Sequence, residues 1–438
     1  VHRACPIRRV VKRAHKRNVK KNKRNQCHFI MLRFLRETLY AEKFVDDARE
    51  ASIISEIPNI GKFGIVGFNP LYWVQLVVLV ALQTIINVAA AVLIYDYIIQ
   101  KPKNGPTWTP HVLGYGVVCP ILVVVPFFFV DMLDLRNGAL MLAAAASCCL
   151  LFFRCIEAIH DTVPKFATRD KATFVMYYAS TVQFCFDPKT DKVEPASLSE
   201  IIRKASLFGS LVLQATILYS ILYPRYEIVS IPEDNQFLSV VYHMVNNFVM
   251  ASLTSVCLEV GATGIGLGIS LISGIKTVDI NDHPLSKSQS PSEFWNKRWN
   301  TLVSHGLKRG VFLPLKKAGF SKPFAAMATF VSSGLMHEYI LVIIAYHEIK
   351  ETRTVPVLGS HLAFFAWNAV VLILEHFCKD WSIFGWISRK FPPIIKTALV
   401  ISTVLPLAHL FTKEYVDSGF YTDFSMGFPR IEYYGREE

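Results

Sequence analysis

An ionisable pair lies inside an otherwise apolar stretch of the chain. His337 and Glu338 end the sequence Ser333-Gly-Leu-Met-His-Glu, near the middle of residues 323–346. Ionisable groups at bilayer depth are costly, and they usually line a polar cavity or pathway. Histidine titrates near neutral pH, so His337 is a candidate general base. A structural histidine that hydrogen-bonds a neighbouring helix is the alternative interpretation of this position.

A second polar cluster precedes this stretch, in the sequence Phe294-Trp-Asn-Lys-Arg-Trp-Asn300. Two tryptophans, two asparagines and an arginine within six residues are typical of an interfacial helix. In that interpretation Trp295 and Trp299 anchor the segment at the membrane surface, while Arg298 and its neighbouring lysine reach the headgroups. The cluster alone therefore favours membrane anchoring.

Long apolar runs surround both clusters and must supply the helices that position them. Most approach the roughly 20 apolar residues that a spanning helix needs. They predict an all-α, polytopic integral membrane protein with about eight or nine transmembrane helices that enclose a chamber. The runs are residues 64–95, 104–130, 137–153, 205–224, 235–258, 260–275, 323–346, 354–374 and 391–412.

The composition supports the membrane class. Of 438 residues, 52% are hydrophobic and only 18% charged, with a mean hydropathy of +0.34. A soluble protein of this length is rarely so apolar. The nine cysteines show no zinc-ligand spacing and are expected to behave as small apolar residues, so neither a metal nor a cofactor is predicted. Gly264 and Gly268, in the run at 260–275, indicate close helix packing.

The net charge of +12 comes from the N-terminal arm. Residues 1–43 hold 14 Lys/Arg and 2 Asp/Glu. No nucleic-acid-binding signature accompanies this arm, so anionic membrane lipids are its expected partner and nucleic acid is not.

The loop at 276–322 holds 9 Lys/Arg and 3 Asp/Glu, which predicts a cytoplasmic position. If residues 235–275 form two helices, six spans separate arm and loop, so both lie on one side and the acidic C-terminal tail lies opposite.

This organisation divides the chain into three parts. Residues 1–63 form a basic cytoplasmic N-terminal arm with an interfacial segment. Residues 64–412 form the multi-span domain, in which residues 276–378 carry the polar clusters, and residues 413–438 form a C-terminal tail.

Together, the two clusters resemble the membrane-bound O-acyltransferase superfamily. Phe294 to Asn300 looks like the Phe-Trp-x-x-Arg-Trp-Asn signature of its wax synthase-like branch, and the segments 282–288 and 364–375 resemble the flanking regions of that branch. The resemblance covers roughly residues 276–378. Asn296 and Lys297 depart from it, because plant wax synthases tend to carry Gly and Arg there, and this departure bears on the acceptor more than on the reaction.

The resemblance implies roles for individual residues. His337 would take the proton of the attacking hydroxyl, and Asn300 would position the thioester or donate toward the developing oxyanion. Glu338 is a candidate for orienting His337, although adjacent helical positions do not face each other. Four residues of the signature, together with Glu338, are the expected substrate-binding side chains: Phe294, Trp295, Arg298 and Trp299.

Basic residues of the loop suit the phosphates of acyl-CoA, although an ordinary cytoplasmic loop would carry the same charge. They are Arg298, Lys308, Arg309, Lys316 and Lys317. Other histidines, such as His243, His361, His376 and His409, are expected to pack helices or lie at the interface. Of these, His376, beside Glu375, is the second candidate base.

The implied activity is transfer of a fatty acyl group from acyl-CoA, as a substrate, to a long-chain alcohol in the endoplasmic reticulum membrane, giving a wax ester and CoA. Diacylglycerol or a sterol is the alternative acceptor. A membrane transporter is a rival of another class, because it also places ionisable groups at mid-membrane. The Trp-rich loop and the lack of paired broken helices disfavour transport. A non-catalytic scaffold is the third possibility, and the sequence sets no oligomeric state.

Overall fold

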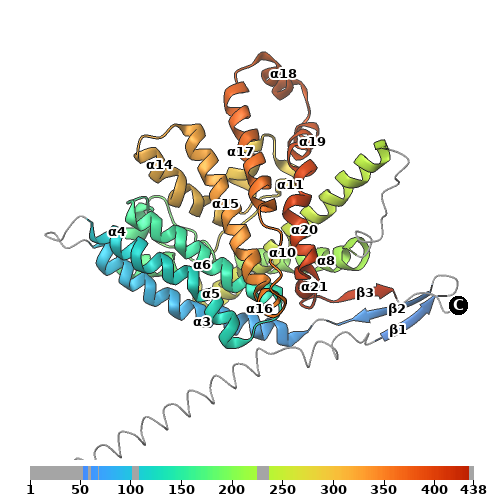
Figure 1. The fold of residues 1–438 in the computed structure, drawn as a ribbon, viewed down its shortest axis with the longest axis horizontal. Coiled ribbons are helices and arrows are strands. Elements are labelled where there is room, and N and C mark those ends of the chain that lie inside the picture. The colour runs from blue at the N-terminus through green and yellow to red at the C-terminus, as the bar shows by residue number, and fades with distance from the viewer. Residues whose placement is uncertain (1–52, 58–60, 68, 101–107, 224–235, 434–438) are drawn as a thin grey trace, which may run out of the picture.

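The computed structural model describes the chain except residues 1–52, 58–60, 68, 101–107, 224–235 and 434–438. Helices make up most of the described chain, which confirms the expected all-α polytopic fold (Figure 1). The helices of the first half are α3 (Pro70–Ile94), α4 (Thr109–Leu113), α5 (Cys119–Leu133), α6 (Gly138–Ile159), α7 (Lys171–Ala179), α8 (Leu198–Ile217) and α10 (Gln236–Ser273).

The second half begins with short helices in the polar loop and continues with longer ones. The short helices are α11 (Pro284–Lys287), α12 (Pro291–Glu293), α13 (Thr301–Leu307) and α14 (Leu313–Lys317). The remaining helices are α15 (Lys322–Ile344), α16 (Tyr346–Thr352), α17 (Ser360–Cys378), α18 (Ser382–Lys390), α19 (Pro393–Val404), α20 (His409–Asp417) and α21 (Phe420–Ser425).

Among the described residues, seven helices are long and apolar enough to cross a membrane. An eighth span results if α19 and α20, which meet at a bend of 51°, are counted as one. The described residues therefore hold seven or eight candidate spans, compared with the eight or nine expected from the sequence.

The difference arises at α10, where the sequence analysis expected two helices. The structure has one helix of 38 residues, from Gln236 to Ser273. Its one carboxylate, Glu259, accepts hydrogen bonds from Asn281 (2.8 Å) and Ser255 (3.0 Å), so the charge is satisfied without a break in the helix. With one helix here in place of two, an even number of spans no longer separates the arm from the loop, so a position on the same side of the membrane does not follow.

A small sheet joins the two ends of the described chain. Strands β1 (Ile53–Ile57), β2 (Gly61–Val66) and β3 (Arg430–Tyr433) pair antiparallel in the order β1-β2-β3, with Ile65 opposite Ile431 (Figure 1). The expectation that the N-terminal arm and the C-terminal tail lie on opposite sides is therefore wrong for these strands. The boundaries expected at 63/64 and 412/413 fall inside β2 and α20, and the basic run at 1–43 lies outside the described residues.

The bend between α19 and α20 follows from Pro406, which lacks the N–H that a continuous helix needs. Two carbonyl oxygens at the bend accept hydrogen bonds from α10. Asn247 Nδ2 donates to the carbonyl of Leu405 at 2.7 Å, and His243 Nε2 donates to that of Pro406 at 3.1 Å. His243 is thus a packing histidine, as the sequence analysis expected, and the bend turns α20 toward α15 and α17.

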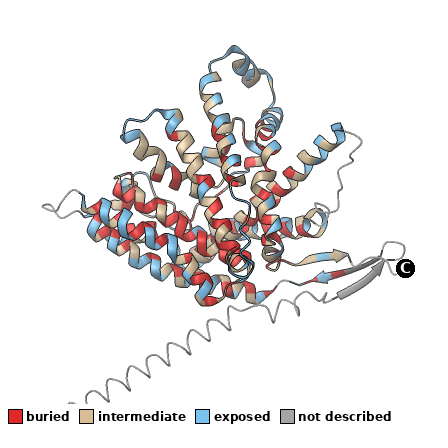
Figure 2. Cartoon of the chain, viewed as in Figure 1, coloured by how far each residue is buried: buried red, intermediate tan, exposed pale blue. Residues whose placement is uncertain are grey.

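The polar loop is held against the helical body. Figure 2 shows buried positions concentrated along α6, whose most apolar window is 72% buried, compared with 17% for α8. Gly310, just after α13, approaches α6 so closely that a Cβ there would lie 2.8 Å from the Phe153 carbonyl oxygen. Gly334 of α15 likewise meets the backbone of Leu362 in α17. These contacts bring α13, α15 and α17 together around one cavity.

Candidate active site

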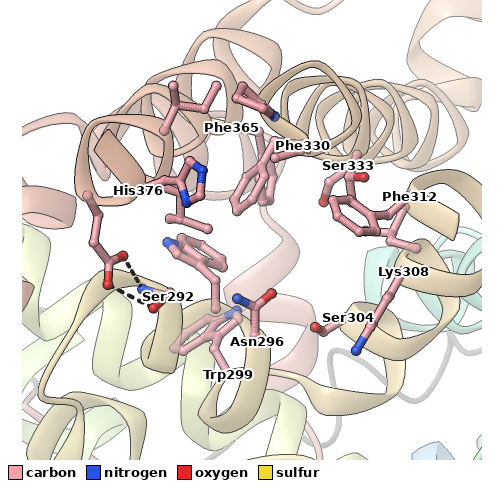
Figure 3. Close-up of a pocket in the computed structure, with 18 of the residues that line it drawn as sticks. Ser292, Asn296, Trp299, Ser304, Lys308, Phe312, Phe330, Ser333, Phe365 and His376 are labelled. Carbon is pink, nitrogen blue, oxygen red and sulfur yellow. Dashed lines mark hydrogen bonds between the residues drawn. The ribbon is translucent and has the colours of Figure 1, made fainter. Parts of the chain in front are cut away.

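A cavity of about 540 Å³ lies between the polar loop and helices α15 and α17. His337 and Asn300, which the sequence analysis paired, both line it. In Figure 3, Asn296 and Trp299 of the loop and the aromatic rings of Phe330 and Phe365 lie on opposite sides of this cavity. Other lining residues include Ser292, Trp295, Ser304, Lys308, Lys322, Ser333, Glu375, His376 and Lys379.

Three aromatic side chains hold the ring of His337. The ring stacks on Phe365 with centroids 5.1 Å apart and meets the edge of Phe411 at 4.9 Å. Its Nδ1 lies 3.2 Å from the hydroxyl of Tyr415. No described residue hydrogen-bonds Nε2 of His337, and His337 lines the cavity. Nε2 is thus the nitrogen left for a substrate.

Glu338, the next residue, faces a different neighbour. Its Oε1 accepts from the backbone N–H groups of Gly359 (2.9 Å) and Leu362 (3.1 Å), at the start of α17. A carboxylate is favourable there because the first N–H groups of a helix lack partners within the helix. Its Oε2 lies 4.0 Å from Nδ1 of His361. Glu338 thus caps α17, does not line the cavity, and makes no hydrogen bond with His337.

Asn300 begins α13 from a left-handed backbone conformation, with φ of 39°. Asparagine adopts this conformation more readily than most residues. Its Oδ1 accepts from the backbone N–H of Val303 at 3.3 Å. Because the carbonyl oxygen is engaged in this cap, the amide NH₂ is the part of the side chain that remains to donate, and no described residue accepts from it.

Asn281 holds Asn300 in place, and the sequence analysis did not find it. Its Oδ1 accepts from the backbone N–H of Asn300 at 2.7 Å, and its Nδ2 donates to Glu259 and Ser255 of α10. The signal was weak, because one asparagine in a polar loop is ordinary. Its partners lie about 20 residues away on either side in the sequence.

The two tryptophans line the cavity, which the surface-anchoring interpretation did not predict. Trp295 donates through Nε1 to Asn368 Oδ1 at 3.2 Å and packs against Phe330 and Phe365. Trp299 stacks on Phe294, with centroids 5.5 Å apart. Phe294 itself is buried and lies outside the cavity lining, so its contribution is to support the ring of Trp299.

Arg298, an expected substrate-binding residue, braces the loop. Its guanidinium bonds Glu293 Oε1 at 2.7 Å and the Asp282 carboxylate at 2.5 Å. Partial burial raises the pKa of the Glu293 carboxyl, but the Gln289 N–H and Arg298 outweigh burial and hold that pKa below its ordinary value. Arg298 does not line the cavity. It holds the two ends of the segment 282–298 together.

Of the basic residues expected to meet phosphates, Lys308 alone lines the cavity. Lys322 and Lys379, which the sequence analysis did not select, line it too, and no carboxylate among the described residues pairs with any of the three. The other candidates have partners elsewhere. Arg309 pairs with Glu157, Lys316 donates to a backbone carbonyl, and Lys317 donates to the carbonyls of His160 and Asp161.

The second candidate base, His376, also lines the cavity, beside Lys379. Glu375 next to it accepts from both the backbone N–H and the hydroxyl of Ser292, each at 2.8 Å (Figure 3). Within the described part of the chain, no group of three or more His, Cys, Asp or Glu residues is arranged to hold a metal ion.

The fold and the cavity thus define a polytopic membrane protein in which a histidine and an asparagine face one chamber. The model of the "Membrane bound O-acyl transferase family" matches residues 281–367, a range that includes both. Over these residues the chain is similar to the membrane-bound O-acyltransferases, and its signature at 294–300 resembles that of their wax synthase-like branch. The match supports an O-acyltransferase activity.

Three proteins of Arabidopsis thaliana are similar to the chain. "Probable long-chain-alcohol O-fatty-acyltransferase 7" is 23% identical over 302 residues, which cover 67% of this chain and 79% of the relative. The protein numbered 2 in the same series is 31% identical over 118 residues, covering 25% of this chain and 32% of the relative. The protein numbered 9 is 32% identical over 88 residues, covering 18% of this chain and 24% of the relative.

Proposed function

We propose that this protein transfers a fatty acyl group from acyl-CoA to the hydroxyl of a long-chain alcohol, forming a wax ester and CoA. The observation that carries the proposal is that His337 and Asn300 line the same cavity, and that no described residue hydrogen-bonds Nε2 of His337 or accepts from the amide NH₂ of Asn300. The names of the three relatives favour a long-chain alcohol over diacylglycerol or a sterol as acceptor.

In this mechanism His337 Nε2 removes the proton from the alcohol as its oxygen attacks the thioester carbonyl carbon. The carbonyl oxygen becomes an oxyanion, and the NH₂ of Asn300 donates a hydrogen bond to it. When the intermediate collapses, the carbon–sulfur bond breaks. The departing thiolate then takes the proton from the His337 imidazolium, so the histidine is regenerated and CoA leaves as a thiol.

The cavity also has features that suit the two substrates. Aromatic rings of Trp295, Phe330 and Phe365 form its inner wall, which is compatible with an acyl or alkyl chain. Lys308 and Lys379, which pair with no carboxylate in the described part of the chain, bring positive charge that suits the phosphates of acyl-CoA. The family resemblance supports the endoplasmic reticulum as the site of the reaction, and co-fractionation with a marker of that membrane tests the location.

The test is ester synthesis by microsomes that contain the protein, supplied with labelled palmitoyl-CoA. Hexadecanol, diacylglycerol and a sterol are offered in parallel, and the wax ester is the expected product. His337→Ala and Asn300→Ala should abolish it, whereas His111→Ala, an exposed histidine away from the cavity, should retain it. Undiminished synthesis by His337→Ala would contradict the mechanism. Loss of synthesis only in His376→Ala would transfer the role of base to His376.

A further inference from the structure

Tyr415 lies behind the histidine of the cavity and is not part of the cavity lining. It belongs to α20, the second half of the helix bent at Pro406, and its side chain is buried, with 4% of the residue exposed. Its hydroxyl is 3.2 Å from Nδ1 of His337. No other described side chain hydrogen-bonds His337.

The surroundings of Tyr415 fix its position. Its ring stacks on His361, with centroids 5.1 Å apart, and packs against Phe420 at 5.4 Å. His361 in turn donates through Nε2 to the carbonyl of Phe411 at 3.0 Å, which ties α17 to α20. Because the ring of Tyr415 is packed by His361 and Phe420, its hydroxyl oxygen has a fixed direction toward His337.

We infer that Tyr415 is a positioning residue that keeps the proton of neutral His337 on Nδ1 and thereby leaves Nε2 as the base. This inference rests on the proposed function. A neutral imidazole carries one N–H, so a base that acts through Nε2 must hold its proton on Nδ1. The Tyr415 oxygen accepts from that N–H. The same bond persists when His337 becomes an imidazolium during attack, and it is then stronger because the donor is charged.

The test compares Tyr415→Phe with the wild type and with Tyr421→Phe, each normalised to the amount of protein in the microsomes. Tyr421 is an equally buried tyrosine whose hydroxyl bonds Thr254 at 2.7 Å, away from the cavity. Tyr415→Phe should lower kcat for ester synthesis about ten- to hundred-fold, the range for a lost hydrogen bond to a charged group. KM for palmitoyl-CoA should stay within about twofold of wild type, because Tyr415 does not line the cavity.

The pH profile separates positioning from mere packing. If His337 is the base, the rate should rise with pH as the histidine loses its proton. An acceptor at Nδ1 stabilises the imidazolium, so its removal should move the acid limb of log kcat to lower pH by about one unit. The other titratable groups around His337 are His361, the Glu338 carboxylate near it, and Cys149 of α6 near Tyr415, and all remain in the variant.

Three outcomes would overturn the inference: an unchanged kcat, an acid limb that does not move, or a limb that moves to higher pH. The last would mean that Tyr415 donates to Nδ1. If Tyr415→Phe does not accumulate, 3-fluorotyrosine at position 415 weakens the acceptor in place, and a smaller shift to lower pH is expected. His337→Ala in the same assay keeps the two proposals distinct, because its activity tests the base and not Tyr415.

Discussion

The backbone N–H of Asn300 donates to the side-chain oxygen of Asn281 at 2.7 Å, so the residue that faces the cavity is held by one that does not. The Nδ2 of Asn281 reaches Glu259 and Ser255 on α10. This bond connects the strained backbone at the start of α13, where φ is 39°, to a helix of the membrane body.

Asn281→Ala should therefore impair catalysis although it leaves the cavity lining intact. The N–H of Asn300 loses its partner, and the left-handed conformation loses its main support, so the amide NH₂ is no longer fixed. We expect kcat for ester synthesis to fall about tenfold or more. Ser286→Ala, an exposed change in the same loop, is the matched control. Equal kcat values for Asn281→Ala and Ser286→Ala would contradict the prediction.

The close approach of α15 and α17 gives a second prediction. A Cβ on Gly334 would lie 2.8 Å from the Cα of Leu362, and backbone cannot move as a side-chain end can. His337 and Phe365, which stack, lie about one turn further along these helices. Gly334→Ala should force the helices apart, lower ester synthesis at least about tenfold, and destabilise the fold by about 1–3 kcal/mol.

Gly268→Ala is the control for that change, because a Cβ at Gly268 meets nothing within 4 Å. It should leave ester synthesis intact and change the unfolding free energy by no more than the helix propensity difference of about 1 kcal/mol. Thermal unfolding in detergent, followed together with activity, distinguishes the two variants. Wild-type activity in Gly334→Ala would show that α15 and α17 tolerate separation.

The same glycines show the limits of local patterns. The spacing of Gly264 and Gly268 predicted packing through both. The prediction is confirmed for Gly264, whose Cβ would lie 3.0 Å from the Phe208 ring, and wrong for Gly268. Gly266 makes the other close approach, to Thr277 at 2.8 Å. Which small residue is needed depends on where the neighbouring chain passes, and that is not encoded in the helix itself.

Some residues of the site could be predicted from local sequence patterns and others could not. His337 was evident because a histidine interrupts an apolar helix, and Asn300 because it ends a dense polar signature. Tyr415 gave no such signal, since it stands among charged residues just after the last apolar run, in the segment expected to form the C-terminal tail. Its contact with His337 spans 78 residues and depends on the bend at Pro406. Most spans could be predicted, as His337 and Asn300 could, because a hydrophobic run is a local feature of the sequence.

An ion pair between α8 and the polar loop gives a prediction about stability. Lys204, with 2% of its side chain exposed, pairs with Asp279 at 2.7 Å, and Arg203 reaches the same carboxylate at 2.8 Å. Asp279→Asn leaves Lys204 buried beside a neutral amide, so we expect a loss of about 3 kcal/mol in unfolding free energy at pH 7. Glu351→Gln, at an exposed pair with Arg136, should cost no more than about 0.5 kcal/mol.

The pH dependence of this pair follows from its carboxyl group. Burial raises the pKa of Asp279, but Lys204 and Arg203 outweigh burial and hold it below its ordinary value. A depressed pKa stabilises the fold fully above the unfolded value of about 3.9, and this stabilisation is lost as the pH falls through the folded value. The difference in thermal midpoint between wild type and Asp279→Asn should thus be constant from pH 6 to 8 and shrink below about pH 4. A difference that grows on acidification would contradict this assignment.

The last prediction concerns how the Trp-rich loop is fastened to α17. Glu375 accepts two hydrogen bonds from Ser292, one from its backbone N–H and one from its hydroxyl. Glu375→Gln replaces one acceptor oxygen with an NH₂ group that cannot accept, so α12 and the adjoining wall of the cavity should dock less firmly. We expect kcat/KM to fall about tenfold and tryptic cleavage after the exposed Lys287 to accelerate.

Ser292→Ala, which removes only the hydroxyl bond, should show a smaller change in the same direction. Glu348→Gln, an exposed and isosteric control on α16, should match wild type in both measurements. If Glu375→Gln also matches wild type, the loop is held by Arg298 and the tryptophans without this contact.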